Sequence, residues 1–147
     1  MLTGILSGVA GEYFVAAELS KRGYIASITL RNSKGVDVLC SNAEATRTVG
    51  IQVKTNQGNT ATWILNQKSE GYYADNLFYS FVCLNNNQKP PDYFIVPSKT
   101  VARFVKESHQ TWLSNPGRHG QAHKDCSMRH FRDDVRQFQN RWDLLGL

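Results

Sequence analysis

The sequence contains no long apolar run, and none of its segments approaches the roughly 20 consecutive apolar residues that cross a bilayer. Its first segment, residues 1–6, is too short for a signal peptide and lacks the basic residues that begin one. Cysteine is scarce: Cys40, Cys83 and Cys126 are an odd number at wide spacing, which argues against a disulfide framework. We therefore expect a cytoplasmic protein that does not enter the membrane.

The motifs of several enzyme classes are also missing. The sequence has no glycine-rich phosphate loop of the Walker or dinucleotide-binding type, and no recognisable Ser, Cys or His nucleophile motif, so acyl-transfer hydrolysis has no support. Its composition, 41% hydrophobic and 20% charged, is that of an ordinary globular protein. The length fits one domain over residues 1–147.

Positive charge is concentrated toward the C-terminus. The net charge is +5; residues 1–96 hold 8 Lys or Arg against 7 Asp or Glu, whereas residues 97–147 hold 9 against 5. A basic segment suits a phosphate-rich partner, because lysine and arginine release the counterions condensed on nucleic acid. The alternative interpretation is a solvated surface, since a small excess of charge constrains the partner loosely.

Apolar periodicity and turn signals predict one helix followed by several strands. The helix is expected over residues 8–22, ending at Gly23, because Lys21 and Arg22 suit a helix C-terminus. A turn is expected over residues 31–35. Strands are expected over residues 24–30, 36–40, 49–55, 77–84 and 93–96, with a short strand or extended edge over 60–65.

Two further helices are expected after the strands. Ser98 is a candidate N-cap for a helix with Val101, Ala102 and Val105 on its apolar face. Near the C-terminus, apolar residues recur at intervals of 4, 3 and 4, as on one helix face; they are Phe131, Val135, Phe138 and Trp142. The elements together predict an α/β fold: a mixed central sheet flanked by helices, with a helical C-terminal extension.

An acidic residue lies on the expected inner face of the first helix. Glu12, Val15, Ala16 and Leu19 fall on one side at 3.6 residues per turn. A carboxylate on a face that packs against a sheet requires a metal ion, a lysine or a hydrogen-bond partner. The alternative is an acid stabilised by the helix macrodipole.

Two of the predicted strands carry polar residues among apolar ones. Asp37 stands beside valines, where acids are uncommon. Gln52 and Lys54 are two residues apart, so both should project from the same face of their strand, unless this is an edge strand with a polar outer side. Carboxylate, amide and backbone carbonyl oxygens are suitable ligands for Mg²⁺. An adjacent lysine can hold a phosphate or orient a water.

This ordered set resembles the PD-(D/E)XK nuclease superfamily, in particular its Holliday-junction-resolvase-like and restriction-endonuclease-like branch. The resemblance covers about residues 4–55 and is carried by the helix segment 8–24, by Gly35-Val36-Asp37-Val38 and by Ile51-Gln52-Val53-Lys54. It implies a restriction-endonuclease-like core of the αβββαβ type.

The resemblance also implies roles for individual residues. Glu12 matches the acid of the first helix, Asp37 the metal-binding aspartate and Lys54 the catalytic lysine. Gln52 replaces the second carboxylate, and Val36 stands where the motif has proline. The implied activity is a Mg²⁺- or Mn²⁺-dependent endonuclease acting on DNA, branched or junction DNA included, as a two-fold dimer. The implied metal ligands are Glu12, Asp37, Gln52 and the carbonyl of Val53.

Two other functions stay open. Because Gln52 removes one anionic ligand, the chain could be a catalytically weak or inactive binding protein, such as an immunity or accessory factor. An RNA-cutting toxin domain would need a delivery module, and none is visible.

The remaining candidates lie mainly in the C-terminal third. His119, His123, Cys126 and His130 could hold Zn²⁺, although their spacing matches no known finger. The same segment also reads as a flexible basic loop in which Arg118 and Lys124 contact phosphates. Ser33, in the turn before Asp37, resembles a polar phosphate-contacting position of the resolvases, and Ser33 and Lys34 are a second candidate nucleic-acid contact. Aromatic residues could stack on bases or pack in the core; they are Trp63, Tyr72, Tyr73, Phe78, Tyr79 and Phe81.

Overall fold

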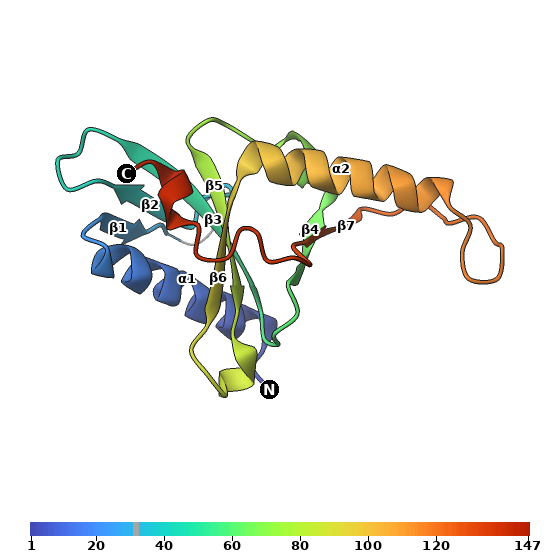
Figure 1. The fold of residues 1–147 in the computed structure, drawn as a ribbon, viewed down its shortest axis with the longest axis horizontal. Helices are drawn as coiled ribbons and strands as arrows, with labels where there is room; N and C mark the ends of the chain where they lie inside the picture. The colour runs from blue at the N-terminus through green and yellow to red at the C-terminus, as the bar shows by residue number, and fades with distance from the viewer. Residues whose placement is uncertain (31–32) are drawn as a thin grey trace.

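The structure is a computed structural model that describes residues 1–30 and 33–147 (Figure 1). Arg31 and Asn32, part of the predicted turn, lie outside the described residues. The helices, strands and 3₁₀ turns (η) follow in the order α1 (Gly4–Lys21), β1 (Ile25–Ile28), β2 (Val38–Ser41), β3 (Thr48–Asn56), β4 (Thr62–Asn66), η1 (Gln67–Gly71), β5 (Leu77–Cys83), η2 (Asn85–Asn87), β6 (Asp92–Pro97), α2 (Ser98–Ser114), β7 (Met128–Arg132) and η3 (Trp142–Leu145).

The strands form a mixed five-stranded sheet and a separate two-stranded one. The larger sheet has the order β1-β2-β3-β5-β6; β3 and β5 are parallel, and every other neighbouring pair is antiparallel. The smaller sheet pairs β4 with β7. Strand β5, which lies between β3 and β6, is buried along its whole length, as expected for a strand that is covered on both faces.

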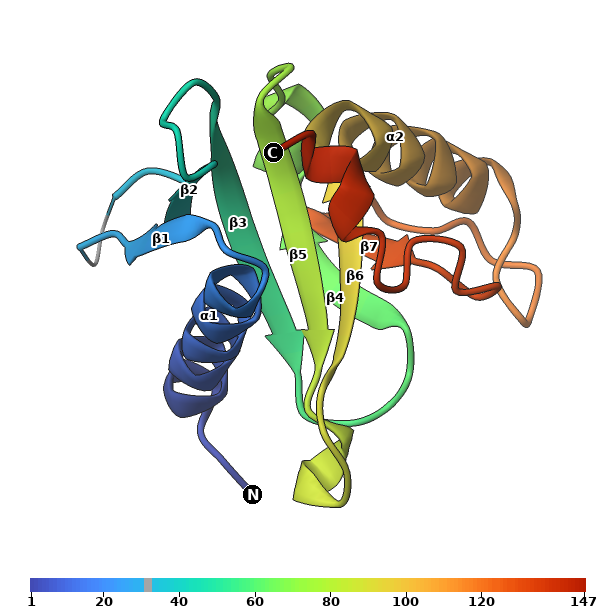
Figure 2. The same ribbon diagram turned by 60° about the vertical axis from the view of Figure 1, so that its left-hand side comes forward.

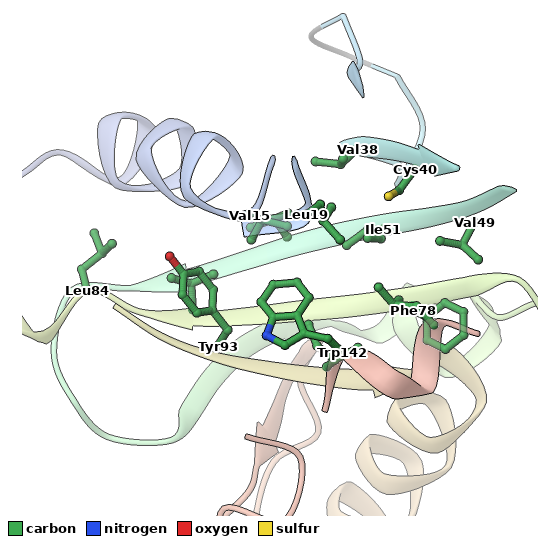
Figure 3. Packing of buried hydrophobic residues seen from close by; sticks show 14 residues of the cluster. Val15, Leu19, Val38, Cys40, Val49, Ile51, Phe78, Leu84, Tyr93 and Trp142 are labelled. Atoms are coloured by element: carbon green, nitrogen blue, oxygen red, sulfur yellow. The ribbon is translucent and has the colours of Figure 1, made fainter. Parts of the chain in front are cut away.

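Helix α1 covers one face of the large sheet (Figure 2). Its buried residues Ser7, Gly11, Val15 and Leu19 recur every four positions, which places one side of the helix against the strands. Val15 and Leu19 join apolar strand residues and Trp142 of η3 in one hydrophobic cluster (Figure 3). Within the described residues, neither helix is both long and apolar enough to span a bilayer.

The opposite face is covered by α2 and the β4–β7 pair. Aromatic rings dominate this second cluster: the centroid of Phe81 lies 4.8 Å from that of Trp63 and 4.6 Å from that of Phe131. Val101 and Val105 of α2 are buried in the same cluster, so the predicted apolar face of this helix is confirmed. The burial of Trp63 and Phe81 favours core packing over base stacking.

Both long helices begin differently from the prediction. Helix α1 starts at Gly4 instead of residue 8, because the Thr3 hydroxyl accepts a hydrogen bond from the Leu6 amide at 3.2 Å and caps the helix. For α2 the cap position is Pro97, and Ser98 is the first helical residue. The Ser98 hydroxyl instead bonds both the amide and the carbonyl of Ala74, at 3.1 and 3.0 Å.

The predicted C-terminal helical stripe is wrong. Phe131 is a buried residue of β7, whereas Val135 is 81% exposed in the turn that follows. The chain turns there because the buried Asp133 carboxylate accepts hydrogen bonds from the amides of Gln137 and Phe138, at 3.0 and 2.8 Å. This local bonding competes with helix formation. The C-terminal extension is therefore a strand, a turn and the short η3.

The different environments of Phe131 and Val135 give a stability test. We expect Phe131→Ala to lower the free energy of unfolding by about 3–5 kcal/mol, since it opens a cavity in the aromatic cluster. Val135→Ala should change it by less than about 0.5 kcal/mol, as is usual at an exposed position. Urea unfolding measures both. Similar losses in the two variants would contradict the strand assignment, because one buried helical stripe would make both residues important.

Candidate active site

Asp37 lies immediately before β2, where the pairing of β2 with β3 begins. Its amide donates to the carbonyl of Ile51 at 2.9 Å, although the register partner of Ile51 is Val38. Two residues thus face one, as in a β-bulge, which redirects a side chain. The Asp37 carboxylate points to the edge of β3, where its Oδ2 accepts a hydrogen bond from the Val53 amide at 2.7 Å. The carboxylate is therefore fixed against the backbone of β3.

Gln52 and Lys54 flank Val53 and project to the other side of the sheet from α1. Ile51 and Val53 are buried in the cluster beneath α1, whereas Gln52 and Lys54 are half-buried and line a cleft of about 550 Å³. The two polar residues share a face, as their spacing predicts. The other residues around this cleft are Lys34, Gly35, Leu65, Asn66, Lys68, Ser69, Gly71, Tyr72 and Tyr79.

Tyr72 links this cleft to Asp37. Its ring lies against Gly35, where an added Cβ would come within 2.2 Å of the Tyr72 hydroxyl oxygen. Gly35 also has a φ of +63°, so both the backbone and the contact require glycine. Burial raises the pKa of the Tyr72 phenol, and the negative charge of Asp37 raises it further. Tyr72 therefore stays neutral at pH 7 and keeps a proton to donate.

Glu12 is half-buried on α1, the helix on the other face of the sheet. Its neighbour Gly11 packs so closely on β3 that a Cβ there would lie 1.9 Å from the Thr55 hydroxyl oxygen. This contact fixes α1 against β3 at Thr55, one residue beyond Lys54 in the sequence. The pairing with β2 covers β3 only as far as Ile51. Glu12 therefore belongs to the helix on the face of the sheet opposite to the Gln52 and Lys54 side chains.

The predicted nucleic-acid contacts fall in two places. Lys34 is exposed and borders the cleft, and the neighbouring Ser33 is exposed but uses its hydroxyl to donate to the Leu30 carbonyl at 2.7 Å. Arg118 and Lys124 are exposed on the loop between α2 and β7. That loop extends away from the large sheet (Figure 1), so these two residues are separate from the cleft.

The predicted zinc ligands do not converge. In the chain outside residues 31–32, no three His, Cys, Asp or Glu side chains are placed to bind one metal ion. His123 instead stacks on Trp112 at 4.1 Å between ring centroids, and His109 pairs with Asp125 at 2.8 Å. These contacts line a larger hollow, of about 780 Å³, and attach the loop to α2. This hollow is less suited to phosphate chemistry than the cleft, because the cleft contains Gln52 and Lys54 and its Tyr72 feels the charge of Asp37.

Sequence reasoning gave Tyr72 only a possible stacking role and missed Lys68. Lys68 is an exposed residue of η1, and η1 reaches the cleft because the Asn66 side chain accepts a hydrogen bond from the Lys68 amide at 3.1 Å. An Asn followed two residues later by Lys was the available signal for this turn. Its position beside the cleft depends on the β4–β7 pairing, which no local pattern specifies.

No family model matches the sequence, and no curated protein does. The solved structures that match include two that do so over nearly their whole lengths. The bacterial homing endonuclease I-Ssp6803I is 13% identical, with a TM-score of 0.60, over 99% of this chain and 94% of that protein. The Holliday junction resolvase Hjc of the archaeon Archaeoglobus fulgidus is 13% identical, with a TM-score of 0.53, over 95% of each chain.

Both matched proteins are PD-(D/E)XK-like nucleases. The likeness confirms the predicted α/β fold with its mixed central sheet and restriction-endonuclease-like core. At 13% identity, it is a likeness of fold. The chemistry must be argued from the residues that this chain carries in the cleft.

The electrostatic effect of Asp37 on Tyr72 gives a titration test. We expect Asp37→Asn to lower the pKa of Tyr72, because it removes the negative charge that disfavours the phenolate, while burial keeps part of the upward shift. Ultraviolet difference titration of each protein against its Tyr72→Phe derivative isolates this phenol. An unchanged pKa of Tyr72 in Asp37→Asn would contradict the placement of the carboxylate beside the cleft.

Proposed function

We propose that this chain is a metal-dependent endonuclease that hydrolyses phosphodiester bonds in DNA, branched or junction DNA included. The observation that supports it most is the Asp37 carboxylate, which lies 2.7 Å from the amide of Val53, the residue between Gln52 and Lys54, whose side chains line the cleft. The nuclease fold of the two matched proteins is consistent with this activity.

The oxygen atoms around this point of β3 suit a small, hard cation. Carboxylate, amide and main-chain carbonyl oxygens are ligands of Mg²⁺, which retains several waters. Asp37, Gln52 and the Val53 carbonyl would hold the ion, with Glu12 directly or through a water. When bound, Mg²⁺ or Mn²⁺ polarises the phosphate and makes water a stronger nucleophile. The Val53 amide orients the Asp37 carboxylate before any ion arrives.

Lys54 supplies the positive charge that the reaction requires. Its side chain lines the cleft and makes neither a hydrogen bond nor an ion pair with the described residues. It is therefore available to orient the attacking water or to stabilise the negative charge that develops on the phosphate. Tyr72, which keeps its proton, can donate a hydrogen bond to a phosphate oxygen.

The substrate contacts would extend outside the cleft. We assign Ser33 and Lys34 to the DNA near the cleaved bond, and Arg118 and Lys124 to DNA farther away. A two-fold dimer would present two such sites to two strands, as the symmetry of a junction requires. These parts of the proposal rest on exposure and charge, and on the fold shared with the resolvase.

A second candidate function is binding without cleavage. Gln52 favours it, because an amide in place of a carboxylate removes one negative ligand and lowers divalent-metal affinity. Such a protein would use the same cleft to hold a phosphate backbone or an acidic partner, with lysines as the main contacts.

The central test is cleavage of plasmid, branched and single-stranded DNA with Mg²⁺ or Mn²⁺. We expect wild-type protein to nick at least one of these substrates, and Lys54→Ala to be slower by about 10²- to 10³-fold, the usual cost of losing one group that stabilises transition-state charge. The matched control is Lys89→Ala, which removes an exposed lysine outside the cleft. Equal rates in wild type and Lys54→Ala would contradict the assigned role.

A further test concerns metal affinity. Gln52→Glu should tighten Mg²⁺ binding by about tenfold, since a carboxylate adds an anionic ligand at contact distance. Gln137→Glu makes the same change of charge at an exposed position after β7 and should leave the affinity unaltered. Titration calorimetry measures all three proteins. Absence of binding in both wild type and Gln52→Glu would favour the binding-only function.

A further inference from the structure

Most cations outside the cleft are engaged by protein groups. Arg129, for example, is 4% exposed and pairs with Glu70 at 2.8 Å, and Arg136 donates to the Asn59 carbonyl at 2.8 Å. These two arginines belong to the basic C-terminal third of the sequence, but they hold its fold together. Net charge along the sequence therefore does not by itself show which cations of this third are available to a polyanion.

The cations without such partners include a group on α2. Arg103 and Lys106 are exposed, and neither forms a hydrogen bond or an ion pair with any part of the chain that the structure describes. They line a shallow hollow of about 440 Å³ between α2 and η1, which also contains the exposed Tyr73 and Lys99. We call these four residues the α2 track. Lys99 pairs with Asp75 at its start.

The α2 track continues from the proposed active cleft. The 3₁₀ turn η1 separates them: Lys68 and Tyr72 line the cleft, and Tyr73 lines the hollow beside α2. The two bonds between Ser98 and Ala74 fasten the start of α2 to the segment that carries both tyrosines. The lysines of the cleft and the cations of α2 therefore lie on adjoining surfaces, on either side of η1.

The spacing along α2 fits a regular polyanion. Arg103 and Lys106 are three residues apart and share a helix face, and the seven helical steps from Lys99 to Lys106 span about 10 Å. One strand of duplex DNA advances about 3.4 Å per phosphate, so this length corresponds to about three phosphates. The acids nearby reduce the positive potential of the α2 track only partly. Glu70 is paired with Arg129 and Asp75 with Lys99, and Glu107 lies beside the track.

We propose that the α2 track binds the phosphate backbone of the duplex arm that leads away from the cleaved bond. The inference rests on the proposed function, because the cleft defines where the arm begins. Lys68 holds the backbone at the cleft, and Arg103 and Lys106 hold it along α2. The track adds sequence-independent affinity and fixes which way the duplex leaves the cleft, but takes no part in the chemistry.

The test compares two double variants that each remove two positive charges. In Arg103→Ala/Lys106→Ala the charges are lost from the track; in the control, Lys21→Ala/Lys89→Ala, they are lost from exposed positions elsewhere, where Glu18 and Asp92 keep Arg22 and Arg136 as partners. Affinity for a short duplex of mixed sequence is measured in EDTA over a series of salt concentrations, so that cleavage does not interfere.

We expect the track variant to bind about 10- to 100-fold more weakly at about 0.1 M salt, and its slope of log affinity against log salt to be shallower by about 1.8, which is two phosphate contacts. The control should keep the wild-type slope, and so should Arg103→Lys/Lys106→Arg, because this variant retains both positive charges. A track variant with the wild-type slope overturns the proposal, as does an equal loss in the control.

Cleavage separates this inference from the proposed function. If the track is right and the chain is a nuclease, the track variant should cut at the wild-type rate once DNA is saturating. If wild type never cleaves but the salt slope still falls in the track variant, the endonuclease activity fails and the track stands. If wild type cleaves and the slope is unchanged, the track fails and the endonuclease stands.

Discussion

The hydrogen bond from the Val53 amide to the Asp37 carboxylate organises the site. It forms at the edge of β3, just beyond the stretch that β2 covers, where a backbone amide would otherwise lack a strand partner. A hydrogen bond to a charged group contributes about 1.5–3 kcal/mol, so the acid satisfies the sheet edge and is itself fixed in place. The same bond joins the Asp37 loop to the strand that carries Gln52 and Lys54.

Close packing against glycine determines what surrounds this bond. Gly11 lets α1, the helix that carries Glu12, approach Thr55 of β3, and Gly35 leaves room for the Tyr72 ring. A side chain at either glycine would have to displace the neighbour that it meets. The cleft is therefore a consequence of two close contacts made by residues with no chemistry of their own.

The local sequence pattern was sufficient to predict the strands and the helix that carry the candidate site. It was insufficient to predict β7 and the turn that follows it. The alternation of Ile51, Gln52, Val53 and Lys54 reads directly as a strand, and the strands and first helix lie where they were expected, within a few residues. The helix predicted from Phe131 onward was wrong, because apolar residues spaced by three and four also occur in a strand followed by a turn. That turn is decided by the Asp133 carboxylate, and the strand by pairing with β4, a partner more than sixty residues away in sequence.

Binding and cutting make different demands on this cleft. Three lysines line the cleft, Lys34, Lys54 and Lys68, and the charge of Asp37 acts on it through Tyr72, so the positive charge of the cleft would favour a phosphate even without a metal ion. Cutting further requires a cation, and here the amide of Gln52 leaves Asp37 and Glu12 as the only carboxylates among the four matched residues. A phosphate already held by lysines would bring its own negative charge to the ion, and would thereby replace the ligand that Gln52 lacks. In such a site, metal affinity would be weak in the free protein and would rise when DNA is bound.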